Sequence, residues 1–89
     1  MYDNVERFRE NLKDTNYVNG GVQHVYSFSN GYGASVVKHD FSYGGKQGLW
    51  ELAVLEGEDI CYTSGITDDV IGHLSWVNVE KILGEIKSL

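Results

Sequence analysis

The spacing of apolar residues along the chain is helical at its N-terminal end. Val5, Phe8 and Leu12 follow one another at intervals of three and four, which places them on a single helix face. The segment after them, DTNYVNGG, is rich in residues that favour turns. The pattern therefore predicts an N-terminal helix that ends before a turn.

From Val22 the period changes to two, because Val22, His24, Tyr26 and Phe28 alternate with more polar residues. The Asn-Gly pair in SNGYG is a strong hairpin signal. Short connections join this run to three later apolar runs. We expect a four-stranded antiparallel β-meander, with strands at about residues 22–29, 34–43, 49–55 and 60–62.

The C-terminal residues return to helical spacing. Ser75 is a suitable N-cap, and a wide apolar stripe runs from Trp76 to Leu89. Just before it, TDDVIG can form one helical turn. The prediction is one α+β domain over residues 1–89 in the order α-β-β-β-β-α, with core residues in both helices and in the LWELAVL strand. The expected core consists of Phe8, Leu12, Trp50, Leu52, Val54, Ile82, Leu83 and Ile86.

Length and cysteine content narrow the class of protein. Eighty-nine residues allow a single core. The single cysteine, Cys61, lies between Ile and Tyr and is expected to be a buried thiol. No secretory leader pattern opens the chain, and no apolar run is as long as a membrane span. These features favour a cytoplasmic protein without a membrane partner.

The net charge of −6 is concentrated in one part of the chain. The segment from Gln47 to Glu80 carries seven acidic residues and no Lys or Arg. Direct phosphate binding needs clustered basic residues, so we expect no direct contact with nucleic acid. A protein with a basic surface is the expected partner, and the alternative is that the acids serve solubility alone.

The triplet Lys38-His39-Asp40 has the residue types of acid–base chemistry. Strand alternation sends neighbouring side chains to opposite faces, so His39 cannot act with either neighbour. It could meet His24 across a hairpin, but no third metal ligand has a fitting spacing. The glycine loops match no phosphate-binding motif and no nucleophile elbow. We therefore expect no catalytic residue, metal site or cofactor, with a nucleotide-like ligand site and a small hydrolase kept as alternatives.

The tyrosine-glycine loops NGYG and SYGG are the candidate contact surface. Tyrosine offers a large contact area at low entropic cost, and Gly, Ser and Asn adapt around it. The alternative is that these tyrosines cover an open sheet face or pack the hairpin ends. The predicted binding residues are Tyr32, Tyr43, Asp40 and Lys46 at the loop edge, and Glu56, Glu58 and Asp59 at the acidic turn.

Four segments, NGYGASVV, FSYGG, GLWELAVL and ITDDVIGHLS, together resemble small uncharacterised bacteriophage proteins. The likeness covers roughly residues 26–86 and carries no assigned activity or functional residue. It implies a phage accessory protein made in the cytoplasm of a bacterial host, where small acidic phage proteins often bind and inhibit host proteins. The expected function is a non-enzymatic protein-binding module. Because one sheet face can lack a cover, a homodimer is also possible.

Overall fold

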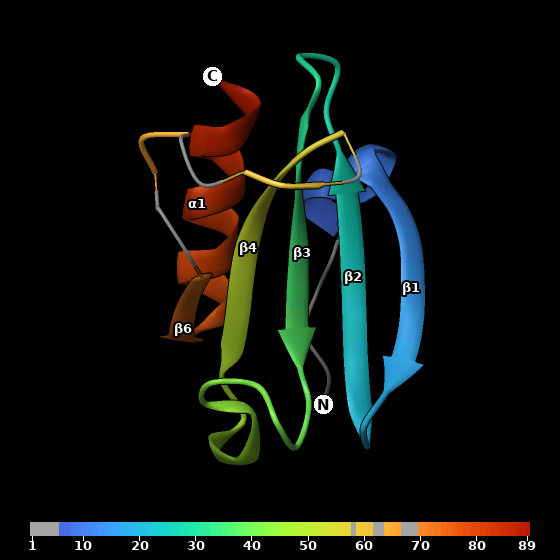
Figure 1. Cartoon of the computed structure of the whole chain (residues 1–89), viewed down its shortest axis with the longest axis vertical. Coiled ribbons are helices and arrows are strands. Elements are labelled where there is room, and N and C mark those ends of the chain that lie inside the picture. Colours follow the sequence, from blue (N-terminus) through green and yellow to red (C-terminus); the bar gives the residue numbers. More distant parts are fainter. Residues whose placement is uncertain (1–5, 58, 62–63, 67–69) are drawn as a thin grey trace.

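The computed structural model describes residues 6–57, 59–61, 64–66 and 70–89, which form one antiparallel sheet backed by one α-helix (Figure 1). The α+β class predicted from the sequence is confirmed. The elements are η1 (Glu6–Asn11), β1 (Leu12–Val18), β2 (Gly21–Ser27), β3 (Tyr32–Lys38), η2 (Gly45–Gln47), β4 (Trp50–Glu56), β5 (Asp59–Ile60), β6 (Val70–Leu74) and α1 (Trp76–Lys87).

Within the described part of the chain, the sheet has six strands rather than the four that we expected. Its order is β1-β2-β3-β4-β5, and β6 also pairs with β4. The additional strand at one edge, β1, turns into β2 through Asn19 and Gly20, whose φ angles are +47° and +80°. Positive φ at both central residues is the conformation of the two-residue hairpin turn that Asn-Gly favours. The other Asn-Gly pair, Asn30-Gly31, lies in the longer connection between β2 and β3.

The predicted N-terminal helix is also wrong in its extent and type. Glu6–Asn11 is a short 3-10 helix with non-helical dihedral angles at Phe8, and the chain then continues as a strand. Phe8 is buried and packs edge-to-face on Phe28, with 6.2 Å between ring centroids. The next residues form β1 because they form backbone hydrogen bonds to β2. The spacing of apolar residues in this segment gives no information about that pairing.

The C-terminal helix is confirmed. Ser75 caps α1, and its hydroxyl accepts a 3.3 Å hydrogen bond from the Asn78 backbone N–H. Before it, Val70–Leu74 forms β6 instead of the helical turn that we expected, because it pairs antiparallel with β4. The two aspartates of TDDVIG lie outside the described residues. Within the described part of the chain, no helix is long and apolar enough to cross a bilayer.

The core lies between α1 and one face of the sheet. That face presents alternate residues of β2, β3 and β4, which meet the apolar stripe of α1. Of the predicted core residues, six are buried, while Leu12 and Ile82 are partly buried against the same cluster. The buried cluster comprises Phe8, Tyr26, Phe28, Ala34, Val36, Trp50, Leu52, Val54, Cys61, Leu74, Val79, Leu83 and Ile86. The prediction of a buried Cys61 is confirmed.

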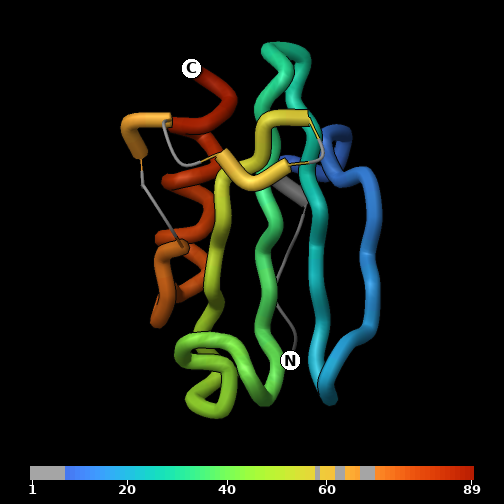
Figure 2. The backbone as a smooth tube through the Cα atoms, in the orientation of Figure 1, coloured from blue at the N-terminus to red at the C-terminus, as the bar shows by residue number. Residues whose placement is uncertain are grey.

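The helices lie on one side of the sheet, and the chain after β4 crosses on the other. In Figure 2 the segment following β4, drawn in yellow, passes in front of the upper ends of β3 and β2. Below it, this face of the sheet has no helix over it (Figure 1). The fold therefore has two layers, and the alternate residues of β2, β3 and β4 face outward.

Candidate functional site

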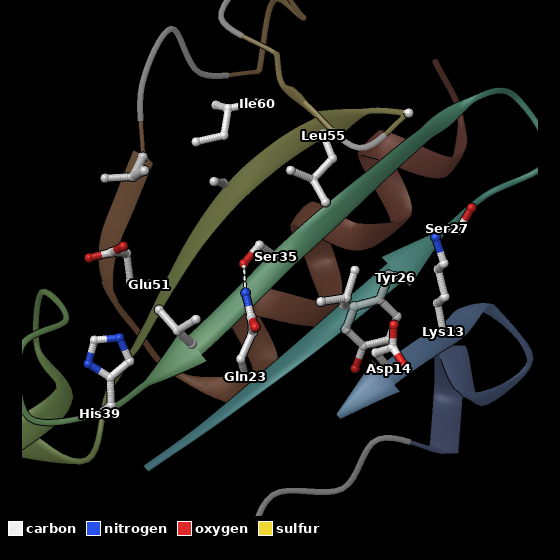
Figure 3. Close-up of a pocket in the computed structure, with 15 residues that line it drawn as sticks. Lys13, Asp14, Gln23, Tyr26, Ser27, Ser35, His39, Glu51, Leu55 and Ile60 are labelled. Carbon is white, nitrogen blue, oxygen red and sulfur yellow. Dashed lines mark hydrogen bonds between the residues drawn. The ribbon is translucent and has the colours of Figure 1, made fainter. Parts of the chain in front are cut away.

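The outward face of the sheet is hollowed, and the hollow has a volume of about 490 Å³ (Figure 3). Its apolar surface comes from Val25, Val37, Ala53 and Leu55, which are alternate residues of three neighbouring strands. An antiparallel sheet with one solvated face normally presents polar residues there. The apolar side chains on this face therefore make it the leading candidate for a binding surface.

A row of hydrogen-bonded polar side chains crosses the same face. The Asn16 Nδ2 donates to Gln23 Oε1 at 3.2 Å, and the Gln23 Nε2 donates to Ser35 Oγ at 2.8 Å. These bonds join β1, β2 and β3 through their side chains. They also hold the Gln23 amide and the Ser35 hydroxyl in the hollow, where both could exchange hydrogen bonds with a ligand (Figure 3).

A β-bulge brings two opposite charges to one end of the hollow. The register of β1 against β2 shifts between Leu12 and Asp14, so Lys13 is an additional residue on the β1 side. Bulges re-aim side chains in this way. Lys13 and Asp14 consequently both line the hollow, although they are adjacent in a strand.

His39 and Glu51 line the other end of the hollow (Figure 3). The His39 Nδ1 accepts a hydrogen bond from the Phe41 backbone N–H at 3.1 Å, which leaves Nε2 as the ring nitrogen that carries the proton when the ring is neutral. The Glu51 Oε1 accepts from the Tyr43 backbone N–H at 2.9 Å. Both side chains are thus tied to the loop that follows β3.

The turn after β4 overhangs the hollow. Leu55, Gly57 and Ile60 line it, and Cys61 is held by a 2.7 Å bond from its backbone N–H to the Val54 carbonyl. The Ile60 side chain is 44% exposed. The overhang therefore adds an exposed apolar side chain to the rim.

Three predicted binding residues lie in the connection between β3 and β4. Asp40 and Lys46 are exposed, and Tyr43 is 62% exposed. Their loop is well braced: the Asp40 backbone N–H donates to the Asn19 carbonyl at 3.2 Å, and the His73 backbone N–H donates to the Tyr43 carbonyl at 3.2 Å. This loop also carries Phe41, an exposed aromatic residue that we did not include.

The structure separates Tyr32 from these three residues. Tyr32 begins β3, is partly buried against the core and lies at the opposite end of that strand from the Asp40 loop. Its register partner is Glu56, which in turn pairs with Asp59. The structure therefore groups Tyr32 with the two exposed acids of the acidic turn, and Glu58 lies outside the described residues.

The three histidines are scattered. His24 stacks on Trp50 on the helix side, with 5.5 Å between ring centroids, whereas His39 lines the outward hollow. Lys38 also faces the helix side, because its Nζ lies 4.7 Å from the Trp50 ring centroid. The predicted separation of Lys38 and His39 onto opposite faces is thus confirmed. Among the described residues, no three His, Cys, Asp or Glu side chains gather as metal ligands do.

The sequence pattern indicated some of the residues that line this hollow. Alternation already placed Ser35, Val37 and His39 on one face. Lys13 and Asp14 could not be found in the same way, because the bulge that aims them lies where the helical spacing predicts the end of a helix. Glu51, which also lines the hollow, is not among the predicted binding residues.

Comparisons of the chain with protein-family models, with curated proteins and with solved structures find no match.

Proposed function

We propose that this protein is a small non-enzymatic protein-binding module, encoded by a phage, that binds and inhibits a host protein with a basic surface. The observation that carries the proposal is the hollowed outward face, which combines apolar side chains with fixed polar groups. Protein interfaces have this composition, with an apolar centre and a polar rim.

The charge around the hollow favours a basic partner. Asp14 and Glu51 line it, and Glu56 and Asp59 are exposed at the turn that overhangs it. Among the described residues that line the hollow, Lys13 is the one lysine and none is an arginine. Acidic groups around an apolar centre would steer a basic surface towards the hollow and align it there.

The phage origin and the inhibitory role rest on the resemblance of four segments to small bacteriophage proteins. Such a protein would act in the host cytoplasm. Tyr43, Asp40 and Lys46 would then extend the contact beyond the hollow, because their loop adjoins the His39 and Glu51 end.

Capture from host lysate with matched variants tests this proposal. Val37→Arg places a large cation in the centre of the hollow, and Val77→Arg adds the same cation on the exposed side of α1. We expect the wild-type protein and the Val77→Arg variant to retain the same host protein, and Val37→Arg to lose it. Equal recovery with both variants, or no specific recovery with any of them, would overturn the proposal.

A small-ligand binding protein is the second candidate. A volume of about 490 Å³ lies within the range of small-molecule sites, and Gln23, Ser35 and His39 offer donors and acceptors. The neighbouring Asp14 and Glu51 disfavour phosphate, so an uncharged or cationic ligand fits better than a nucleotide. Thermal-shift measurements with a metabolite panel would separate the two candidates, since a ligand shift abolished by Val37→Arg supports the second.

The geometry does not favour a small hydrolase. The His39 Nδ1 accepts from the Phe41 backbone N–H at 3.1 Å, and the Ser42 hydroxyl donates to the His39 backbone carbonyl at 2.9 Å rather than to the ring. Nucleophilic catalysis needs the hydroxyl within reach of a base that is oriented by a third group.

A further inference from the structure

The edge strand β1 has a regular segment that nothing pairs with on its outer side among the described residues. The order of the sheet places β1 at one edge, and β2 is its single partner there. Its side chains from Lys13 to Tyr17 are exposed, and Tyr17 is 85% exposed. Unprotected edges of this kind are templates for pairing with another strand.

The register shows which backbone groups are available. Val18 and Gly21 close a two-residue hairpin, so they form a hydrogen-bonded pair. From there, non-hydrogen-bonded and hydrogen-bonded pairs alternate along β1 and β2. Tyr17–Val22 and Thr15–His24 are therefore the non-hydrogen-bonded pairs. The N–H and C=O groups of Thr15 and Tyr17 consequently point away from β2, towards the outside of the sheet.

The region around this edge is free of net charge, although the chain carries −6. No Asp, Glu, Lys or Arg occurs from Thr15 to Val37. The described acids of the acidic stretch lie on β4, β5 and α1, and β2 and β3 separate β4 from β1 in the order of the sheet. Two copies can therefore approach through the part of β1 from Thr15 to Val18 without bringing like charges of that strand together.

We propose that a second copy of this chain pairs with β1, antiparallel, in a register centred on Asn16. In this register Thr15 of each copy lies opposite Tyr17 of the other copy. The outward backbone groups of both residues therefore form hydrogen bonds between the chains. The Thr–Tyr pairs are of the β-branched and aromatic type that stabilises neighbouring strands. The pairing uses residues 14–18 and leaves out the bulge at Lys13.

The opposite edge of the sheet is less suitable for such pairing. The register of β6 against β4 is interrupted between Trp50 and Leu52, and His73 within β6 has a φ of +56°. A residue in that conformation disrupts the regular alternation of backbone groups. The five-residue segment of β1 from Asp14 to Val18 has no such interruption.

The proposed dimer has a consequence for the hollow. Antiparallel pairing of two identical edge strands places a two-fold axis perpendicular to the sheet, so the outward faces of both copies lie on the same side. The two hollows would then face one direction across a continuous sheet. This dimer does not depend on the proposed function, because β1 pairing uses backbone groups at the edge of the sheet, whereas partner binding uses side chains on its outward face.

Sedimentation at several concentrations tests the self-association. The interface is small, so the average mass should rise from 10.0 kDa towards twice that value between about 10 µM and about 1 mM. The variant Asn16→Lys places two like charges opposite each other at the two-fold axis and should keep the protein monomeric. The variant Val77→Lys adds the same charge on α1 and should associate like the wild type.

A disulfide test checks the register. Two copies of Asn16 would have Cα atoms about 4.5 Å apart, within the range of a disulfide. The two copies of Tyr17 would be offset by two residues, which is roughly 6.7 Å along the strand, in addition to the spacing between the strands. Their Cα atoms would therefore be too far apart for a disulfide. Mild oxidation should convert Asn16→Cys to a band of twice the chain mass and leave Tyr17→Cys monomeric.

The outcomes that overturn the proposal are distinct. A wild-type mass that stays at 10.0 kDa over the whole concentration range excludes the dimer. If Tyr17→Cys forms the disulfide faster than Asn16→Cys, the proposed register is excluded. Such a result would mean that cross-linking arises from random collisions at the more exposed position. Self-association that Asn16→Lys leaves unchanged excludes β1 as the interface.

Discussion

Tyr26 is a buried residue whose hydroxyl has no hydrogen-bond partner among the described residues. Burial raises the pKa of its phenol to about 12, and the nearby Glu80 carboxylate adds to this shift. The phenol in the unfolded chain has its ordinary pKa of 10.0. The folded state therefore binds the proton more tightly, so stability is unaffected below pH 10 and falls as the pH rises towards about 12.

The first prediction follows from this shift. Between pH 9 and pH 12 the wild-type protein should lose about 2–3 kcal/mol more of its unfolding free energy than Tyr26→Phe, which has no proton to release at this position. Urea unfolding of both proteins at a series of alkaline pH values measures the difference. Parallel pH profiles of the two proteins would contradict the assignment.

Asn30 joins the first tyrosine-glycine loop to the end of α1. Its Nδ2 donates to the carbonyls of Ile86 at 2.9 Å, Lys87 at 3.2 Å and Leu89 at 3.3 Å. Its Oδ1 accepts from the Tyr32 backbone N–H at 3.0 Å. Helix ends leave carbonyl groups without partners inside the helix, and Asn30 supplies a donor for them. The NGYG loop is thus a structural connection as well as a turn.

The second prediction concerns this connection. Asn30→Ala should lower the unfolding free energy by about 1–3 kcal/mol, because it removes the donor to the Ile86 carbonyl, in a partly buried hydrogen bond. Ser29→Ala in the same turn is the matched control, since Ser29 is exposed, and its effect should stay within about 0.5 kcal/mol. Chemical denaturation of the three proteins measures both effects. Equal stability of the two variants would refute the role of Asn30.

At the scale of elements, the one long helix supports the sheet. α1 contacts β3, β4, β6 and η1, and three of its residues are fully buried. Those residues, Val79, Leu83 and Ile86, lie at spacings of four and three along the helix. The helix therefore contributes to stability chiefly through this stripe, because an isolated twelve-residue helix is marginal in water.

The third prediction tests that contribution. Leu83→Ala should lower the unfolding free energy by about 2–5 kcal/mol through lost burial and the cavity that remains. Val77→Ala, on the exposed side of the same helix, should change it by less than about 0.5 kcal/mol. Thermal or urea unfolding distinguishes them. Similar small effects at both positions would show that α1 is not the main cover of the sheet.

At the scale of the whole molecule, the charge distribution should govern how fast a partner binds. The exposed acids Glu56 and Asp59 lie at the overhang of the hollow, whereas Glu85 is exposed on α1. Charged groups at the rim of an interface mainly affect the association rate and its salt dependence. The acidic turn is therefore expected to steer the partner, and the apolar hollow to hold it.

The fourth prediction follows once a partner has been captured. Glu56→Lys with Asp59→Lys should slow association by roughly tenfold or more at low salt and flatten its salt dependence. Glu85→Lys should have a much smaller effect. Surface plasmon resonance at several ionic strengths measures the rates. A loss confined to the dissociation rate, or an equal loss with Glu85→Lys, would contradict the steering role.

The sequence by itself determined the α+β class, the C-terminal helix with its Ser75 cap, and the three strands now labelled β2, β3 and β4. These elements have local signals: a period of two or of 3.6, a capping residue and an Asn-Gly turn. Alternation also separated Lys38 from His39 correctly, because the direction of a side chain in a regular strand depends only on its position.

The tertiary structure alone decided the identity of the segments before β2 and before α1. Leu12–Val18 and Val70–Leu74 are strands because β2 and β4 present hydrogen-bonding edges to them. Strand formation depends on such neighbours, which local spacing does not encode. The same long-range pairing creates the bulge that turns Lys13 and Asp14 into the hollow, and it separates Tyr32 from Tyr43. The candidate site is thus a product of pairing between distant segments, which is the physical reason that the sequence pattern indicated only part of it.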